Sequence, residues 1–406
     1  MMPIRPDRLI GDLRALAAIG KYETGVHRPA FSAEDIAARE WLRGKLTEAG
    51  LEAQVDGVGN VYGRMASVEK AVIVGSHTDT VPYGGWLDGA LGTIYGLEVA
   101  RCIAESGATK LGVDVVSFQD EEGSYLGLMG SRLFCGEDVS QEMAAAVGQD
   151  GKPLERAIDE TGLRGRPLAR LDPARHVAFL EAHIEQGPRL ESSGTKIGVV
   201  SAIVGIKTLR LTFHGQANHA GTTPMDMRHD AGAAALLFGA GIQERLRAAS
   251  GPDSVWNVGS ARFAPGAANV VPAEAELVMQ MRDTSEDILA KLEEIVRETA
   301  QQAADRYKVT LDIVPVMQTA PSAMDPKLAG LIARAAEERG VSHVSLPSGA
   351  GHDAMIMARH LPAAMLFVPS IGGRSHHVSE DTAEADIITG AEVMLRAVEL
   401  LIAERG

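Results

Sequence analysis

The sequence predicts an α/β protein with a doubly wound mixed sheet, interrupted by an inserted ferredoxin-like βαββαβ domain. Two observations carry this prediction. In the first and last parts of the chain, short apolar runs alternate with apolar helical segments, as in a sheet with helices on both faces. Between Lys207 and Val316, strands instead alternate apolar and polar positions, which is typical of a sheet with one solvated face. We therefore expect one domain over 1–206 and 318–406, and the insert over 207–317.

The elements before the insert follow from spacing and end signals. Leu9, Leu13 and Leu16 have the spacing of one helix face. Ser32 can cap the next helix and Gly50 can end it. The expected elements are helices over 6–19, 33–49 and 91–105, a β-like segment with glycine turns over 51–65, and strands over 71–75, 112–118 and 177–180.

The insert and the last part of the chain are assigned in the same way. Leu209, Leu211 and Phe213 alternate with polar residues, as in a half-buried strand. The insert continues with a helix over 230–248, strands over 255–263 and 274–282, a helix over 285–307 and a strand over 309–314. After it we expect a helix over 326–339, a loop over 347–353, a helix to 360, a strand over 363–368, a loop over 372–377 and a helix over 382–404.

Composition limits the class of protein. The 406 residues exceed a typical single domain, which favours two domains. Acidic residues outnumber basic ones, 54 against 39, and the formal charge of −15 argues against nucleic acid or an anionic membrane as a partner. The only cysteines, Cys102 and Cys135, fit a reducing compartment. The first residues lack the layout of a signal peptide, and no apolar run reaches the ~18 residues of a membrane span. We therefore expect a cytoplasmic protein.

Candidate metal-binding side chains follow the predicted strands. His77 and Asp79 come just after the strand over 71–75, where open α/β sheets place ligands. Their side chains point the same way if the chain stays extended, so one can be a ligand and the other can orient it. Asp88 follows in a glycine-flanked turn before an apolar helix. We take these residues as the first half of a metal site.

Other candidates follow three further predicted strands: Glu121 with Glu122, then His183, then His376. Any one alone is weak evidence, because a single histidine at a strand end is more often structural and adjacent glutamates usually form a solvated turn. Three histidines and several carboxylates at one edge of one sheet are harder to explain in that way. Imidazole and carboxylate ligands without cysteine suit Zn²⁺, Mn²⁺, Co²⁺ or Ni²⁺.

The two adjacent glutamates need not have the same task. Neighbouring residues in an extended turn face opposite ways, so one of Glu121 and Glu122 can bind metal while the other holds an attacking water as general base. A two-metal site needs a bridging carboxylate, and Asp88 in its rigid turn is suited to that.

Six motifs together resemble those of one enzyme family. They are Gly75-Ser76-His77-Thr78-Asp79-Thr80, Leu87-Asp88-Gly89, Glu121-Glu122-Gly123, His183-Ile184-Glu185-Gln186-Gly187-Pro188, Asn218-His219-Ala220-Gly221-Thr222-Thr223-Pro224-Met225 and Ser375-His376. In order and kind they resemble the N-carbamoyl-L-amino-acid hydrolase, allantoate amidohydrolase and β-ureidopropionase family, a branch of the dinuclear aminoacylase and carboxypeptidase clan. The fourth and fifth motifs are the most specific.

The resemblance implies a catalytic domain with two divalent metal ions, Zn²⁺ being the first expectation. One ion would be bound by His77, Asp88 and His183, and the second by Asp88, Glu122 and His376, with Asp88 as the bridge. The resemblance also makes Glu121 the general base and Asp79 the residue that orients His77. These implied roles agree with the reasoning from the residues alone.

The resemblance implies further contacts with a small ureido-acid substrate. His219, in the insert, would polarise the scissile carbonyl oxygen and reach the active site of the partner subunit, so that the insert is a lid and dimerisation domain of a homodimer. Asn269 and Arg282 would hold the α-carboxylate, and Gln186 would line the pocket. The forked Arg282 side chain, at the end of an alternating strand, fits a carboxylate, although a surface salt bridge is its simpler explanation.

The implied reaction is hydrolysis of a linear ureido or amide C–N bond, with an N-carbamoyl-L-amino acid as the first substrate and amino acid, CO₂ and ammonia as products. Allantoate, ureidoglycolate and ureidopropionate remain open as substrates. An aminoacylase or dipeptidase is the nearest alternative, and a catalytically silent binding protein is the alternative from another class. His377 is a rival ligand to His376, and His352-Asp353 has no assigned role. Trp86 either narrows the pocket or packs under its loop.

Overall fold

The computed structural model describes residues 3–107 and 110–405. The chain forms two compact units, Met1–Ser201 with Ala323–Gly406, and Ala202–Ser322. The domain boundaries expected at 207 and 317 lie inside the second unit, a few residues from its ends. Met1 and Met2, where the expectation about a signal peptide begins, lie outside the described residues.

The first unit is built on one mixed sheet whose middle strands are parallel. β7 pairs in parallel with β5 and β17, and β5 pairs in parallel with β6, whereas β4 and β8 pair antiparallel with their neighbours in this group. In spatial order the strands are β15 (Ser322–Ala323), β8 (Ile197–Ile203), β17 (Ala363–Val368), β7 (His176–Ile184), β5 (Lys70–His77), β6 (Leu111–Phe118), β4 (Val61–Arg64) and β3 (Glu52–Val55), and β16 (His343–Ser348) pairs with β8. The predicted doubly wound mixed sheet is confirmed.

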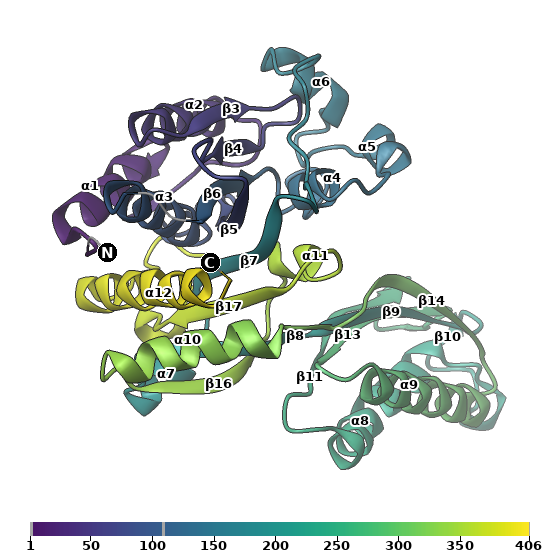
Figure 1. The fold of residues 1–406 in the computed structure, drawn as a ribbon. Coiled ribbons are helices and arrows are strands. Elements are labelled where there is room, and N and C mark those ends of the chain that lie inside the picture. The colour runs from purple at the N-terminus through teal and green to yellow at the C-terminus, as the bar shows by residue number, and fades with distance from the viewer. Residues whose placement is uncertain (1–2, 108–109, 406) are drawn as a thin grey trace. The chain divides into compact units, whose positions relative to one another are not determined.

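Helices cover both faces of this sheet (Figure 1). α3 lies on one face with α1, α10 and α12, and α4 and α11 lie on the other. Every residue of α3 from Ala90 to Ile103 is buried, as expected for a helix that is apolar on most sides. The helices of this unit are α1 (Pro6–Ala18), α2 (Ala33–Glu48), α3 (Ala90–Glu105), α4 (Met129–Phe134), α5 (Ser140–Ala145), α6 (Leu154–Glu160), α7 (Arg189–Ser193), α10 (Pro326–Glu338), α11 (Ala354–Met357) and α12 (Glu384–Arg405).

Three expectations about the first unit need correction. The strand expected to end at residue 180 continues to Ile184, because β17 pairs with it as far as Ile184 and Val368. His183 therefore lies within β7 rather than beyond it. The loop expected over 347–353 begins later, because Ser348 still belongs to β16, and the helix expected to reach 360 ends at Met357.

The second unit contains an antiparallel sheet with the spatial order β11-β13-β9-β14. Its chain order, with α8 after β9 and α9 after β13, confirms the predicted βαββαβ pattern. Leu209, Leu211 and Phe213 are buried in the same core as residues of α8 and α9. The elements are β9 (Gly205–His214), α8 (Ala231–Ala249), β11 (Val255–Ala264), β13 (Glu274–Asp283), α9 (Glu286–Tyr307) and β14 (Thr310–Thr319), with an unexpected short pair, β10 (Asn218–His219) and β12 (Val270–Val271).

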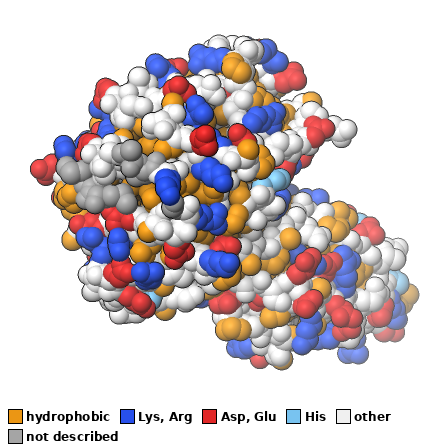
Figure 2. Space-filling view, viewed as in Figure 1, with side chains coloured by type: hydrophobic (Ala, Val, Ile, Leu, Met, Phe, Trp, Pro, Cys, Tyr) orange, Lys and Arg blue, Asp and Glu red, His pale blue; other side chains and the backbone are white. Residues whose placement is uncertain are grey.

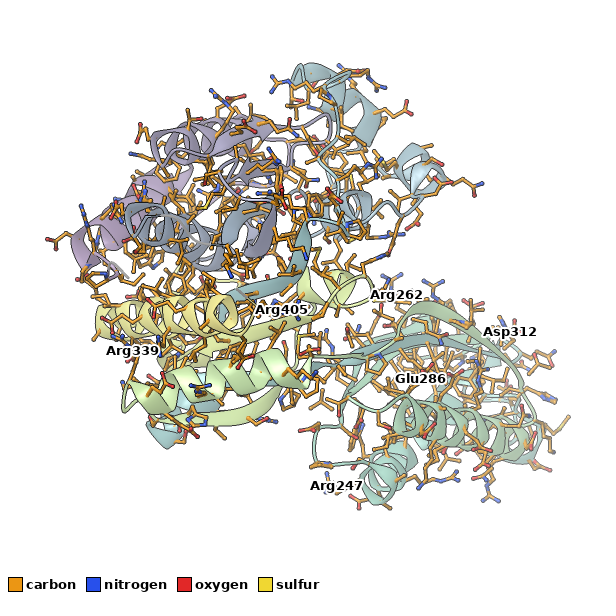
Figure 3. The ribbon with its side chains drawn as sticks, in the orientation of Figure 1. Arg247, Arg262, Glu286, Asp312, Arg339 and Arg405 are labelled. Atoms are coloured by element: carbon orange, nitrogen blue, oxygen red, sulfur yellow. The ribbon has the colours of Figure 1, made fainter. Side chains whose placement is uncertain are left out.

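Charged side chains of both signs are mixed on the face shown in Figure 2. In the second unit, Arg262 on edge strand β11 and Asp312 on edge strand β14 are exposed (Figure 3). Charges on edge strands oppose uncontrolled pairing of one sheet edge with another. Within the described part of the chain, each helix is too short or too polar to cross a membrane.

Candidate metal centre

The carboxyl ends of four neighbouring strands meet at one edge of the large sheet. His77 is the last residue of β5, and His183 is the next-to-last residue of β7. Glu121 and Glu122 follow β6, and His376 lies in the loop after β17. The parallel pairing of β6, β5, β7 and β17 therefore brings these residues together from distant parts of the sequence.

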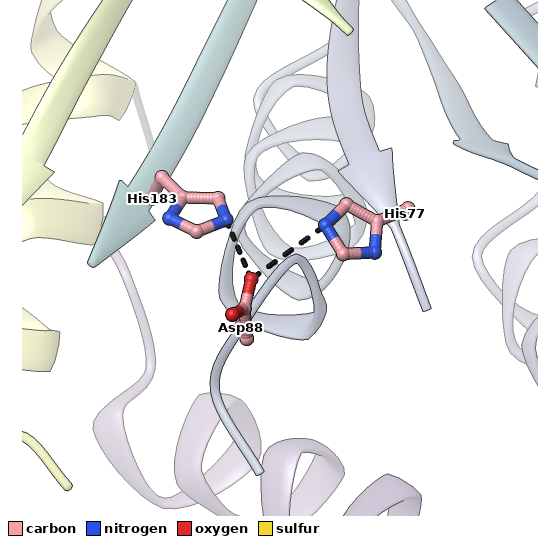
Figure 4. Close-up of side chains that lie close together, drawn as sticks. All are labelled: His77, Asp88 and His183. Atoms are coloured by element: carbon pink, nitrogen blue, oxygen red, sulfur yellow. Dashed lines mark ion pairs between the residues drawn. The ribbon is translucent and has the colours of Figure 1, made fainter. Parts of the chain in front are cut away.

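The first group of ligand atoms comes from His77, Asp88 and His183, all three of which are buried (Figure 4). Asp88 Oδ1 lies 2.9 Å from His183 Nε2 and 3.7 Å from His77 Nε2. The opposite ring nitrogens face backbone carbonyls: His77 Nδ1 is 3.0 Å from the oxygen of Asp79, and His183 Nδ1 is 2.8 Å from that of Ile184. A proton on each Nδ1 leaves Nε2 of both rings directed at Asp88, which is the arrangement of metal-binding histidines.

The second group consists of Asp88, Glu122 and His376. His376 Nε2 lies 3.4 Å from Asp88 Oδ2 and 3.5 Å from Glu122 Oε2. Asp88 thus gives one carboxylate oxygen to each group. Within each group the candidate ligand atoms lie within 4.8 Å of one another.

Electrostatics at this edge of the sheet favour a bound cation. Burial, reinforced by Glu122, raises the pKa of Glu121 well above its ordinary value, and burial with Asp88 does the same to the pKa of Glu122. Burial acts to lower the pKa of His183, but Asp88 outweighs it and raises that pKa to about 9. Glu122 Oε1 is buried without a hydrogen-bond partner. A divalent cation would offset the repulsion between these crowded carboxylates and would give the unpaired Glu122 oxygen a partner. The donor set therefore fits a metal.

The candidate base and the candidate orienting residue lie beside the first group. Glu121 Oε2 is 3.6 Å from His77 Nε2, but Glu121 belongs to neither group of ligands. Asp79 is fully buried, and burial raises its pKa to about 6 despite the nearby Arg39. It touches His77 through its backbone oxygen at 3.0 Å, while its carboxylate oxygen is 3.8 Å from the ring.

Four side chains hold these groups in place; Gln186 and Ser375 belong to the motifs noted in the sequence, whereas Arg39 and Glu380 were missed by sequence reasoning. Ser375 and Gln186 both donate to Asp88 Oδ2, at 3.0 and 2.9 Å. The buried Glu380 carboxyl group accepts the backbone N–H of Asp88 at 3.0 Å, and its Oε2 lies 2.8 Å from the Ser375 hydroxyl, whose single proton is directed at Asp88. Arg39 lies 3.5 Å from the carboxylate of Asp79. Nothing in the sequence pattern indicates Glu380, since the turn it supports is 292 residues away.

The structure also places three residues whose roles the sequence left open: His377, His352 and Trp86. His377 bonds to Ser379 and belongs to neither ligand group. The buried His352 ring lies 4.5 Å from the ring of His183, and its Nε2 is 2.9 Å from the Ser348 hydroxyl. Trp86 packs against the core and bonds to Asp381 at 3.3 Å, which favours packing under its loop.

The remaining candidates belong to the second unit. His219 is exposed, and its Nδ1 accepts the N–H groups of Gly221 and Thr222 at 3.0 and 3.2 Å. The neighbouring segment carries Asn269, whose backbone carbonyl oxygen accepts the backbone N–H of Ala220 at 3.0 Å. Arg282 lies near the other end of β13, opposite Ile206 and Val255. The structure therefore brings Asn269 close to His219, near the start of β13, and places Arg282 near the other end of β13.

Comparisons with known proteins agree over nearly the whole chain. Residues 73–400 match the model of peptidase family M20/M25/M40. The N-carbamoyl-L-amino-acid amidohydrolase of Paenarthrobacter aurescens is 34% identical over 97% of this chain and 98% of its own length. The allantoate amidohydrolase of Escherichia coli (strain K12) is 33% identical over 91% of each chain. The crystal structure of an amidase of the hydantoinase/carbamoylase family from Burkholderia phymatum has a TM-score of 0.93 and 43% identity, and covers 100% of this chain and 99% of that one.

Proposed function

The chain belongs to peptidase family M20/M25/M40, among its hydantoinase/carbamoylase-type amidases, and is therefore a metal-dependent hydrolase of C–N bonds. From this premise we propose that it cleaves the ureido bond of an N-carbamoyl-L-amino acid. The observation that carries the proposal is the pair of ligand groups that share Asp88. The amidohydrolase from Paenarthrobacter aurescens, whose name specifies this substrate, supports the choice. The allantoate amidohydrolase from Escherichia coli makes allantoate the second candidate.

His77, Asp88 and His183 would hold one divalent ion, and Asp88, Glu122 and His376 the other. The likeness to an M20 peptidase described as dinuclear and metal-binding rests on 16% identity and shows the fold alone, so the assignment depends on the donors themselves. Nitrogen and oxygen donors suit Zn²⁺ first, then Mn²⁺, Co²⁺ or Ni²⁺. These residues would hold ions that could polarise a carbonyl and lower the pKa of a bound water to about 7.

Glu121 acts as general base and then as general acid. Its carboxylate is next to the ligand groups without belonging to either, so it remains available to accept a proton from the attacking water. The same carboxyl then delivers that proton to the leaving nitrogen. Asp79 fixes His77, whose Nδ1 faces the Asp79 backbone oxygen at 3.0 Å. Gln186, which donates to Asp88, lines the site on the side of His376.

His219 donates a hydrogen bond to the scissile carbonyl oxygen. Its Nδ1 accepts two backbone N–H groups, so the ring proton of the neutral form sits on Nε2. An Nε2–H on this short exposed strand is a donor suited to negative charge that develops on that oxygen. Asn269 lies on the adjoining segment and would bind the same substrate molecule.

The positions of His219 and Arg282 support the proposal that two copies of the chain share each active site. Along β13, the eight-residue step from Glu274 to Arg282 spans about 27 Å at ~3.4 Å per residue. His219 and Asn269 lie near the Glu274 end, because β10 and β12 follow β9 and precede β13 there. A small ureido acid cannot bridge that distance. We therefore propose that His219 and Asn269 serve the partner subunit's site in a homodimer formed through the second unit. Arg282 then binds the carboxylate of a different substrate molecule from the one that His219 of the same chain contacts.

The activity can be tested by measuring ammonia release. The metal-stripped protein is reconstituted separately with Zn²⁺, Mn²⁺, Co²⁺ or Ni²⁺ and given N-carbamoyl-L-amino acids, N-carbamoyl-β-alanine, allantoate, ureidoglycolate and an N-acetyl amino acid. We expect metal-dependent ammonia release from the N-carbamoyl-L-amino acids, since the two ligand groups supply the chemistry for a ureido bond. Turnover of allantoate alone would select the second candidate, and amino acid release from the N-acetyl compound alone would make the protein an aminoacylase.

Subunit sharing can be tested with two inactive variants. Glu121→Gln and His219→Ala are co-expressed with different tags, and the mixed dimer is purified through both. If His219 serves the partner's site, one complete site forms in each mixed dimer, and about half of the wild-type activity returns. If His219 serves its own subunit, neither site is complete and the mixed dimer stays as inactive as either parent. Each variant purified alone is the control.

A further inference from the structure

A cavity of about 500 Å³ adjoins the candidate metal centre within the first unit. It shares Glu122 with the second ligand group and extends from there along the segments that follow β5 and β6. Its volume lies in the range of small-molecule sites, ~300–1,000 Å³. The apolar and aromatic part of its wall includes Ala30, Phe31, Val81, Pro82, Tyr83 and Tyr125.

Polar side chains around this cavity are mostly engaged with the protein itself. The Ser32 hydroxyl accepts the N–H of Asp35 as a helix cap, and the Ser124 hydroxyl accepts the N–H of Ala30. Lys152 bonds to Glu160 at 2.8 Å. The lining also includes His27, Gln149 and Asp150, so the cavity combines an apolar and aromatic wall with a polar rim.

Two of the aromatic residues are held in strained backbone conformations. Phe31 has a φ of 63° and Tyr83 a φ of 57°, values that bulky side chains rarely adopt. Tyr83 stacks on His27 with ring centroids 4.5 Å apart, and the Phe31 ring meets the edge of Tyr125 at 5.7 Å. Gln186 and His376 at the metal centre also have positive φ. Strained conformations of this kind are often found where a protein positions a ligand, and they fix the directions of these two aromatic rings.

We propose that this cavity is the substrate's side-chain pocket, and that it selects N-carbamoyl-L-amino acids with a large apolar or aromatic side chain. This inference rests on the proposed function. An N-carbamoyl amino acid has three parts: its carbamoyl group belongs at the metal ligands, and its carboxylate belongs with a cationic side chain. The side chain is the part that remains, and an apolar cavity next to Glu122 matches it. The second ureido group of allantoate would leave its polar atoms unpaired there.

The first test is the ratio of kcat/KM for N-carbamoyl-L-phenylalanine to that for N-carbamoylglycine, whose α-hydrogen cannot enter the cavity. One methylene group in an apolar pocket changes specificity by ~10–200-fold, so we expect a ratio of at least ~30. The Val81→Phe variant, which fills the cavity, should lower the ratio at least ~10-fold. Val81→Ala, which enlarges it, should shift preference towards N-carbamoyl-L-tryptophan. Val147→Phe makes the same change at an exposed position nearby that does not line the cavity, and it should leave the ratio unchanged.

Binding provides a readout that is independent of turnover. Calorimetric titration of the Glu121→Gln protein should show tighter binding and a more negative heat-capacity change for N-carbamoyl-L-phenylalanine than for N-carbamoylglycine, because only the first buries an aromatic ring. Equal kcat/KM values, or Val81 variants that change both substrates alike, would overturn the pocket assignment and leave the proposed function intact. A preference for large N-acyl groups would place the acyl group in the cavity instead. If no N-carbamoyl compound is hydrolysed, the proposed function fails, and the pocket assignment fails with it.

Discussion

Asp88→Asn is expected to lower the rate of ureido-bond hydrolysis by more than ~100-fold. Loss of a residue that only supports a metal ligand costs up to ~100-fold, and Asp88 is itself a candidate ligand, so its loss should cost more. Asp88 belongs to both ligand groups and is only 3% exposed. Its Oδ2 accepts hydrogen bonds from Gln186 and Ser375, so an amide nitrogen at that position would oppose two donors. If the amide turned the other way, its nitrogen would face His183 Nε2 in place of Oδ1. Either orientation removes one negative charge and one of the two ligand oxygens.

The deciding measurement is metal content per chain after dialysis, followed by elemental analysis. We expect the unchanged protein to retain two ions and Asp88→Asn to retain fewer than one. Asp381→Asn is the matched control, since Asp381 follows Glu380 in sequence, belongs to neither ligand group and bonds to Trp86. Retention of two ions by the Asp88 variant would contradict a shared ligand. Loss of metal from both variants would show that the loop, rather than the Asp88 carboxylate, determines metal retention.

The convergence of the candidate ligands could be predicted because it follows from topology. His77, Glu122 and His376 come after predicted strands, and the carboxyl ends of parallel strands meet at one edge of a sheet. This reasoning does not depend on the exact strand lengths. His183 still lies at the same edge of the sheet, although β7 extends past it. The alternation in the insert likewise required only its period of two, and the buried face of β13 confirms it.

The supporting residues could not be predicted, because their roles depend on tertiary packing. Arg39 lies in a helix next to apolar positions, and its charge suggests a solvent-exposed residue. It is instead fully buried, paired with Asp35 at 2.8 Å and directed at Asp79. Glu380 supports the turn of Asp88 across most of the chain. Buried charges of this kind are stable only with partners that local sequence does not reveal.

Glu121→Gln and Glu122→Gln make the same chemical change at adjacent residues, and we expect them to fail in different ways. An amide at position 121 cannot accept a proton, so kcat should fall by ~10²–10⁴-fold, the usual contribution of a general base. Metal content should not change, because Glu121 belongs to neither ligand group. Glu122 lies 3.5 Å from His376 within the second group, so its variant should lose about one ion per chain along with activity.

The pair separates proton transfer from metal binding, which activity alone cannot do. Burial and the neighbouring carboxylates raise the pKa of both glutamates in the absence of a cation, so neither side chain is distinguished by its electrostatics. They are distinguished by direction: Glu121 faces His77, and Glu122 faces His376. If the Glu121 variant lost an ion and the Glu122 variant kept both, the two roles would have to be exchanged. If both variants lost one ion, Glu121 would be a ligand, and the general base would have to be another residue.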